Sequence, residues 1–145
     1  MNIFSSKFGK IFIVLNILKR GKEMKNIVII GGGASGLVAA IFAAKSGKKV
    51  CIIEKNNVCG KKILATGNGR CNYWNEEQSI SHYRSNNIDL VKEVLSNKNK
   101  EMILEFFEEI GILPKIKNGY YYPFSNQAIT MQKALVLEVE KLNID

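Results

Sequence analysis

A glycine-rich turn between an apolar run and an alanine-rich segment constrains this chain more than any other feature. Residues 26–30 (NIVII) form an apolar run that leads directly into Gly31-Gly32-Gly33-Ala34-Ser35-Gly36, which has the spacing G-x-G-x-x-G. An alanine-rich segment follows, then a second apolar run over residues 50–53, and then Glu54. This order predicts a β-α-β unit that holds a dinucleotide by its pyrophosphate.

Each residue of the turn is expected to have its own role in cofactor binding. Gly31 permits a sharp turn out of the strand, and Gly33 has no Cβ to keep the backbone away from a pyrophosphate. Gly36 allows the helix to pack close to the strand. A helix that begins near Ser35 directs its unpaired N–H groups at the phosphates. The expected cofactor-binding residues of the turn are Gly31, Gly33, Ala34, Ser35 and Gly36.

Glu54 is the expected ribose ligand at the end of the second strand. Its carboxylate can accept hydrogen bonds from ribose hydroxyls and would repel a 2′-phosphate, which favours an unphosphorylated adenosine ribose. The alternative is a glycine-rich turn without a ligand. A phosphate loop of the NTPase type is excluded, because Leu37 and Val38 stand where that motif needs Lys and Ser or Thr.

Positive charge is concentrated around this predicted site. The formal net charge of the 145 residues is +8, and residues 45–70 hold seven basic side chains against the single acid Glu54. A basic field attracts anions such as a pyrophosphate. The competing interpretation is nucleic-acid binding, but the chain has no nucleic-acid-binding motif, so we expect no nucleic-acid partner.

The cysteines do not indicate a metal site or a disulfide scaffold. Cys51, Cys59 and Cys71 lack the C-x-x-C spacing, and the single histidine, His82, lies in a polar segment. We expect no metal, packing roles for Cys51 and Cys71, a solvated His82, and reduced thiols in a cytoplasmic protein.

Residues 1–23 are predicted to be an N-terminal extension, upstream of a natural start at Met24. The apolar run 11–18 is too short to span a bilayer, so we expect no membrane partner. Met24 stands just before the first predicted strand, where such a domain commonly begins.

A second motif makes the chain similar to a known family. Residues 60–72 read GKKILATGNGRCN, and residues 122–128 read YPFSNQA. Together with GGG-x-x-GL and the acid after the second strand, this pattern resembles the BaiN-like (YhiN-like) family of NAD(P)/FAD-dependent oxidoreductases. The matching motifs run in order from Met24 to about Leu142, and the chain departs from the family at Trp74, where threonine is usual.

The resemblance implies a glutathione-reductase-like, Rossmann-like α/β domain with FAD as cofactor and NAD(P)H as a candidate electron donor. It also implies a small-molecule substrate for a full-length form. It extends the cofactor-binding residues of the turn and Glu54 to Lys55, Lys62, Thr66, Gly67, Gly69, Arg70 and Asn72. It indicates no catalytic residue.

The second half of the chain is predicted to add helices and a hairpin. Residues 88–95 and 100–110 have helical spacing, with Asn99 and Gly111 at the ends of the second helix. Asn118-Gly119 predicts a β-hairpin, and Ser125 is expected to cap a final helix. The expected apolar positions of the two longer helices are Met102, Ile103, Phe106, Phe107 and Ile110, then Met131, Leu135, Val139 and Leu142.

Residues 143–145 are expected to lead into a further parallel strand, so residues 24–145 are interpreted as the N-terminal part of a truncated FAD-binding domain with an incomplete sheet. Three functions stay open at this point. They are the FAD-binding portion of an oxidoreductase, an NAD-linked dehydrogenase domain, and a non-catalytic remnant.

Overall fold

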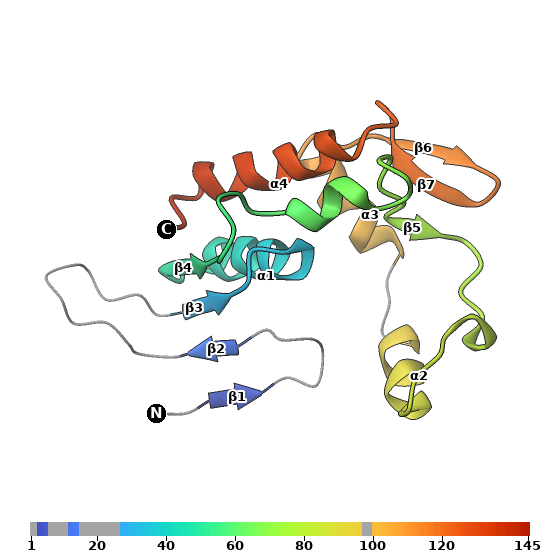
Figure 1. The fold of residues 1–145 in the computed structure, drawn as a ribbon, viewed down its shortest axis with the longest axis horizontal. Helices are drawn as coiled ribbons and strands as arrows, with labels where there is room; N and C mark the ends of the chain where they lie inside the picture. The colour runs from blue at the N-terminus through green and yellow to red at the C-terminus, as the bar shows by residue number, and fades with distance from the viewer. Residues whose placement is uncertain (1–2, 6–11, 15–26, 97–99) are drawn as a thin grey trace, which may run out of the picture.

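The computed structural model describes residues 3–5, 12–14, 27–96 and 100–145. Its larger sheet has the order β1-β2-β3-β4, with β1 at Ile3–Ser5, β2 at Phe12–Val14, β3 at Ile27–Ile30 and β4 at Val50–Ile53 (Figure 1). The β3 and β4 strands are parallel, whereas β1, β2 and β3 pair antiparallel. The sheet is therefore mixed, because the two strands within residues 1–23 add antiparallel pairs that we did not predict.

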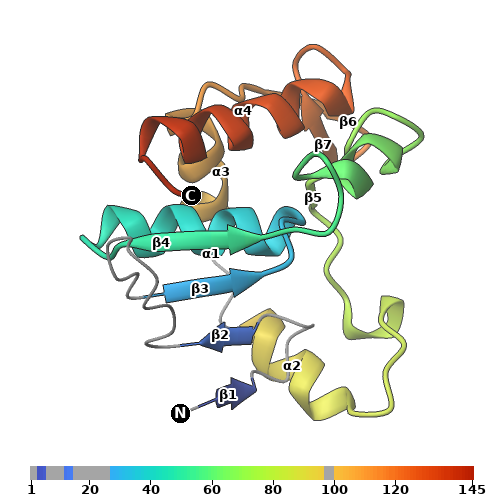
Figure 2. The same cartoon turned by 60° about the vertical axis from the view of Figure 1, so that its left-hand side comes forward.

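The predicted β-α-β unit is confirmed. Helix α1, Ala34–Lys45, connects β3 to β4 and runs alongside the sheet (Figure 2). Ala40 of α1 is fully buried in a cluster with Ile29 of β3 and Val50 of β4. The small alanine side chain lets the helix axis lie close to the sheet, and the short connection 31–33 keeps the helix N-terminus next to the end of β3.

A second, smaller sheet lies beyond the carboxyl ends of β3 and β4 (Figure 2). It has the order β5-β7-β6, with β5 at Trp74–Asn75, β6 at Pro114–Lys117 and β7 at Tyr120–Pro123. The β6–β7 hairpin is confirmed, and its Asn118 and Gly119 have φ of 52° and 78°, the signature of a type I′ turn. The two-residue strand β5, which begins at Trp74, was not predicted.

Three further α-helices complete the described part of the chain: α2 at Ile88–Ser96, α3 at Lys100–Glu109 and α4 at Ala128–Lys141. Short 3₁₀ helices span Lys61–Ala65 and Ile80–His82. Gly111, with φ of 85°, ends α3 as predicted, whereas Asn99 lies outside the described residues. Met102, which was expected on the apolar face of this helix, is 51% exposed, so its expected place in the core is wrong.

Helix α4 begins later than predicted, because a residue distant in sequence pairs with its first N–H group. Its N-cap is Gln127, which makes no side-chain capping bond, and Ser125 accepts a bond from the Gln127 N–H outside the helix. The first helical N–H, at Ala128, donates to the carbonyl oxygen of Gly69 at 2.7 Å. A loop distant in sequence thus supplies the cap that we had assigned to Ser125.

The largest buried cluster joins α1 and α4 through Leu37, Ile41, Met131 and Leu135. Cys71 is buried in this cluster, which confirms its predicted packing role, whereas Cys51 is only half-buried. His82 is exposed, as predicted. After α4 the chain runs beside β4, where the Asp145 N–H donates to Val50 and the Asp145 carbonyl accepts from Ile52, a parallel bridge.

Candidate dinucleotide-binding site

The turn after β3 has a backbone geometry that requires glycine at two positions. Gly31 has φ of 103°, in the region that favours glycine, and its N–H donates to the Ile53 carbonyl at 2.8 Å. A Cβ at Gly36 would overlap the Gly31 carbonyl oxygen and lie 3.5 Å from Cγ2 of Ile29. The predicted close packing of the helix against the strand at Gly36 is therefore confirmed, and the nearest atom belongs to Gly31 of the turn.

The N-terminus of α1 is open. Its N-cap, Gly33, makes no side-chain capping bond, and Gly33, Ala34 and Ser35 are all exposed. A Cβ built at Gly33 would have no heavy atom within 4 Å. The first N–H groups of this 12-residue helix therefore face a space with room for an anion, and the helix dipole favours negative charge there.

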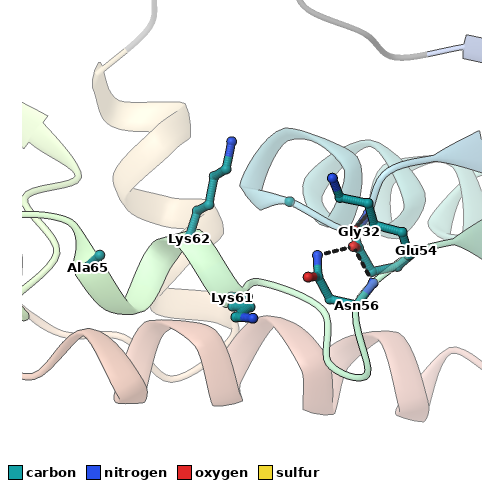
Figure 3. A pocket seen from close by; sticks show the side chains of 8 residues that line it. Gly32, Glu54, Asn56, Lys61, Lys62 and Ala65 are labelled. Atoms are coloured by element: carbon teal, nitrogen blue, oxygen red, sulfur yellow. Dashed lines mark hydrogen bonds between the residues drawn. The ribbon is translucent and has the colours of Figure 1, made fainter.

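Glu54, at the carboxyl end of β4, is held by the turn. Its Oε2 accepts from the Gly32 N–H at 2.7 Å, and its Oε1 accepts from the Asn56 N–H at 2.8 Å and from the Asn56 side-chain amide (Figure 3). These donors, the Asn56 N–H first, hold the pKa of Glu54 below its usual value. The carboxylate is thus ionised at neutral pH and fixed beside the turn.

A cleft of about 570 Å³ opens between the turn and the 3₁₀ helix Lys61–Ala65. Gly60, with φ of 73°, begins that helix, and its N–H donates to the Gly32 carbonyl at 2.6 Å, which joins the two walls. The residues that line the cleft are Gly32, Gly33, Glu54, Lys55, Asn56, Lys61, Lys62 and Ala65. The volume is in the range of small-molecule sites, and three lysines supply positive charge.

The cleft brings together four of the predicted site residues, Gly33, Glu54, Lys55 and Lys62. The other four lining residues, Gly32, Asn56, Lys61 and Ala65, were not among the predicted site residues. Lys61 was visible as the neighbour of Lys62 in the basic cluster. Asn56 carried no signal, because its importance depends on where its amide lies relative to Glu54.

The predicted loop residues Thr66, Gly67, Gly69, Arg70 and Asn72 follow the 3₁₀ helix but do not line this cleft. Thr66 Oγ1 donates to the Ile63 carbonyl at 2.6 Å, and Arg70 Nε donates to the Gly67 carbonyl at 3.1 Å. The Arg70 guanidinium lies 5.0 Å from the centre of the Tyr122 ring. The structure therefore places these residues in a separate loop next to the cleft.

Two residues of that loop have unusual backbone conformations. Asn68 and Cys71 have φ of 54° and 59°, which non-glycine residues rarely adopt. The Thr66 carbonyl accepts from the Cys71 N–H at 3.0 Å, and burial raises the pKa of the Cys71 thiol. A strained loop that is braced by the core has a defined shape, as a binding loop requires.

The family model of the HI0933-like protein Rossmann domain matches residues 25–145. The chain belongs to this family. The match confirms the resemblance to BaiN-like flavoproteins, and FAD is the cofactor of the HI0933-like domain.

Two curated relatives cover most of the HI0933-like domain described above. The 3-dehydro-bile acid delta(4,6)-reductase of Clostridium scindens is 44% identical over 123 residues, 83% of this chain and 30% of the relative. The ribosomal RNA dihydrouridine synthase of Escherichia coli is 30% identical over 122 residues, 84% of this chain and 30% of the relative. The chain therefore spans about a third of the length of these relatives.

A solved structure confirms the fold of the HI0933-like domain. Thermovibrio ammonificans THI4 aligns with a TM-score of 0.51 and 23% identity over 81% of this chain and 35% of that protein. Among the described residues, no helix is both long and apolar enough to cross a membrane. The same residues contain no cluster of three or more His, Cys, Asp or Glu side chains suited to a metal ion.

Proposed function

We propose that this chain is the FAD-binding part of a flavin-dependent reductase that acts on a carbon–carbon double bond conjugated to a carbonyl group. One observation carries the cofactor site: the open N-terminus of α1, the ionised Glu54 and three lysines face one cleft. The residues fit the cofactor, because a Cβ at Gly33 would project into empty space beside the uncapped N–H groups.

Each group of residues has a proposed role toward FAD. The N–H groups at Gly33, Ala34 and Ser35 hold the pyrophosphate, together with the charge of Lys55 and Lys62. Glu54 accepts from the adenosine ribose. The loop of Thr66, Gly67, Gly69, Arg70 and Asn72 lies toward the flavin, since it follows directly from the cleft wall. FAD supplies the hydride chemistry, and the protein binds and orients it.

The names of the relatives support the reaction class. Reduction of a 3-dehydro-bile acid with Δ4,6 double bonds adds hydrogen to a dienone, and formation of dihydrouridine adds hydrogen to the pyrimidine double bond next to a carbonyl. Both add a hydride and a proton to an electron-poor C=C bond. We propose a small-molecule substrate, because the bile-acid reductase has the higher identity of the two relatives. We also propose NAD(P)H as the electron donor and a cytoplasmic location.

Cofactor binding is tested with the purified chain and added FAD. We expect quenching of flavin fluorescence, competition by ADP, and no competition by FMN, because the described cleft is assigned to the adenosine half. A protein that binds NADH but not FAD would support the NAD-linked dehydrogenase alternative. A protein that binds neither nucleotide would support the non-catalytic remnant.

The reaction class is tested separately by NAD(P)H oxidation with FAD present. A 3-oxo-Δ4,6 steroid is the test substrate, and its saturated analogue is the control. Uridine-containing RNA is the second substrate, because the dihydrouridine synthase covers 84% of the chain. Turnover of RNA alone would replace the small-molecule proposal.

A further inference from the structure

The carboxylate of Glu54 has most of its hydrogen-bonding capacity in use. Two backbone N–H groups donate to it, those of Gly32 at 2.7 Å and Asn56 at 2.8 Å, and the Lys55 N–H has a smaller effect that also lowers the Glu54 pKa. The third donor is the side-chain amide of Asn56, which shares Oε1 with the backbone N–H. Since a carboxylate offers about four acceptor positions, roughly one is left.

A ribose diol needs two acceptor positions on this carboxylate. The backbone donors cannot leave, because the Gly32 N–H belongs to the turn and the Gly32 carbonyl is itself held by Gly60. The Asn56 amide can leave, because it is on a half-buried side chain that lines the open cleft (Figure 3). Once displaced it meets solvent, so its release leaves no buried polar group without a partner.

We propose that Asn56 is a specificity-determining residue whose amide competes with the ribose diol for Glu54. The inference rests on the proposed function of the cleft as a dinucleotide site. A ligand with both hydroxyls must displace the Asn56 amide, so it gains two hydrogen bonds and breaks one. A 2′-deoxy ligand uses the remaining acceptor position and displaces nothing. Asn56 therefore lowers the affinity of Glu54 for a ribose with both hydroxyls and leaves its affinity for a 2′-deoxyribose unchanged.

The test compares ADP with 2′-deoxy-ADP by calorimetry on the chain and its Asn56→Ala variant. The variant keeps the backbone N–H that fixes Glu54. We expect ADP to bind at least about tenfold more tightly to the variant, as one hydrogen bond to a charged group is worth, and 2′-deoxy-ADP to bind within about twofold of the original. Asn57→Ala is the matched control, because the exposed Asn57 side chain does not line the cleft; it should change neither affinity.

The outcomes separate this inference from the proposed function. If the original chain binds neither ADP nor FAD, the proposed function fails and the inference fails with it. If the original chain binds ADP and Asn56→Ala weakens both ligands, or strengthens both equally, the inference alone is overturned. Thermal unfolding of each variant, recorded without ligand, shows whether an affinity change reflects the site or a loss of folded protein.

Discussion

Gly33→Ala and Gly36→Ala are expected to separate ligand binding from folding within one turn. Both variants add a single methyl group. At Gly33 the new Cβ has no heavy atom within 4 Å, whereas at Gly36 it overlaps the carbonyl oxygen of Gly31. Gly33 has φ of −76° and ψ of −178°, which alanine also adopts, so neither strain nor contact opposes that substitution in the empty protein.

The magnitudes follow from these contacts. Gly33→Ala should cost less than about 1 kcal/mol of folding stability, the difference between glycine and alanine at an N-cap. Gly36→Ala should cost about 1–3 kcal/mol, as overpacking does, because the turn or α1 must move. At about 4 °C per kcal/mol for a domain of this size, the melting temperature should fall by roughly 4–12 °C.

ADP affinity should be lowered by the substitution that costs little folding stability, Gly33→Ala. The Gly33 methyl group projects into the space assigned to the pyrophosphate, so the loss of charge-assisted hydrogen bonds should weaken ADP at least about tenfold. Thermal unfolding without ligand and ADP calorimetry measure the two effects. Full ADP affinity in Gly33→Ala would refute the assigned pyrophosphate position, and an unchanged melting temperature in Gly36→Ala would refute the close approach to the Gly31 carbonyl.

Three further outcomes are expected. The N–H donors hold the pKa of Glu54 below 4.5, so its contribution to stability is present above the unfolded pKa and is lost as pH falls through the lower folded value. Thermal unfolding at decreasing pH should show this loss of stability, and Glu54→Gln should make it smaller. Burial, and next the charge of Glu108, raise the pKa of Tyr73 from 10.0 to about 12. The contribution of Tyr73 to stability should therefore be constant below pH 10 and be lost as pH rises toward 12, and Tyr73→Phe should move alkaline unfolding to higher pH. Leu135 is 2% exposed and Leu137 is 62% exposed. In denaturant titration, Leu135→Ala should lower the free energy of unfolding by about 2–5 kcal/mol, and Leu137→Ala by less than about 0.5 kcal/mol. Equal losses would contradict the assigned core.

Local signals predicted the features whose geometry is local. Gly31 and Asn118-Gly119 occupy backbone conformations that few residues adopt, so their sequence alone marks the turns. The end of α3 at Gly111 follows the same rule. The confirmed β-α-β unit combines such a turn with apolar periodicity on either side, and both are properties of neighbouring residues.

Features that depend on distant residues were predicted less well. Ser125 fitted the pattern of an N-cap, but the carbonyl of Gly69 caps α4, and no local pattern records that contact. Glu138 lies on α4 and is 8% exposed, and Lys45 of α1 and Lys141 lie 3.7 Å and 3.4 Å from its carboxylate, which offsets the cost of burying the charge. Such a buried acid is recognised only from the cations packed around it.

The sequence by itself determined that a glycine turn follows a strand, opens a helix and is followed by an acid, because steric limits on the backbone and the period of apolar residues act over a few positions. Only the tertiary structure decided that Asn56 shares the carboxylate of Glu54, that Lys61 and Lys62 face the same cleft as Gly33, and that the loop of Arg70 lies outside it. Hydrogen bonds and clefts depend on distances between side chains, and those distances are set by the packing of α1, α4 and the 3₁₀ helix against one another.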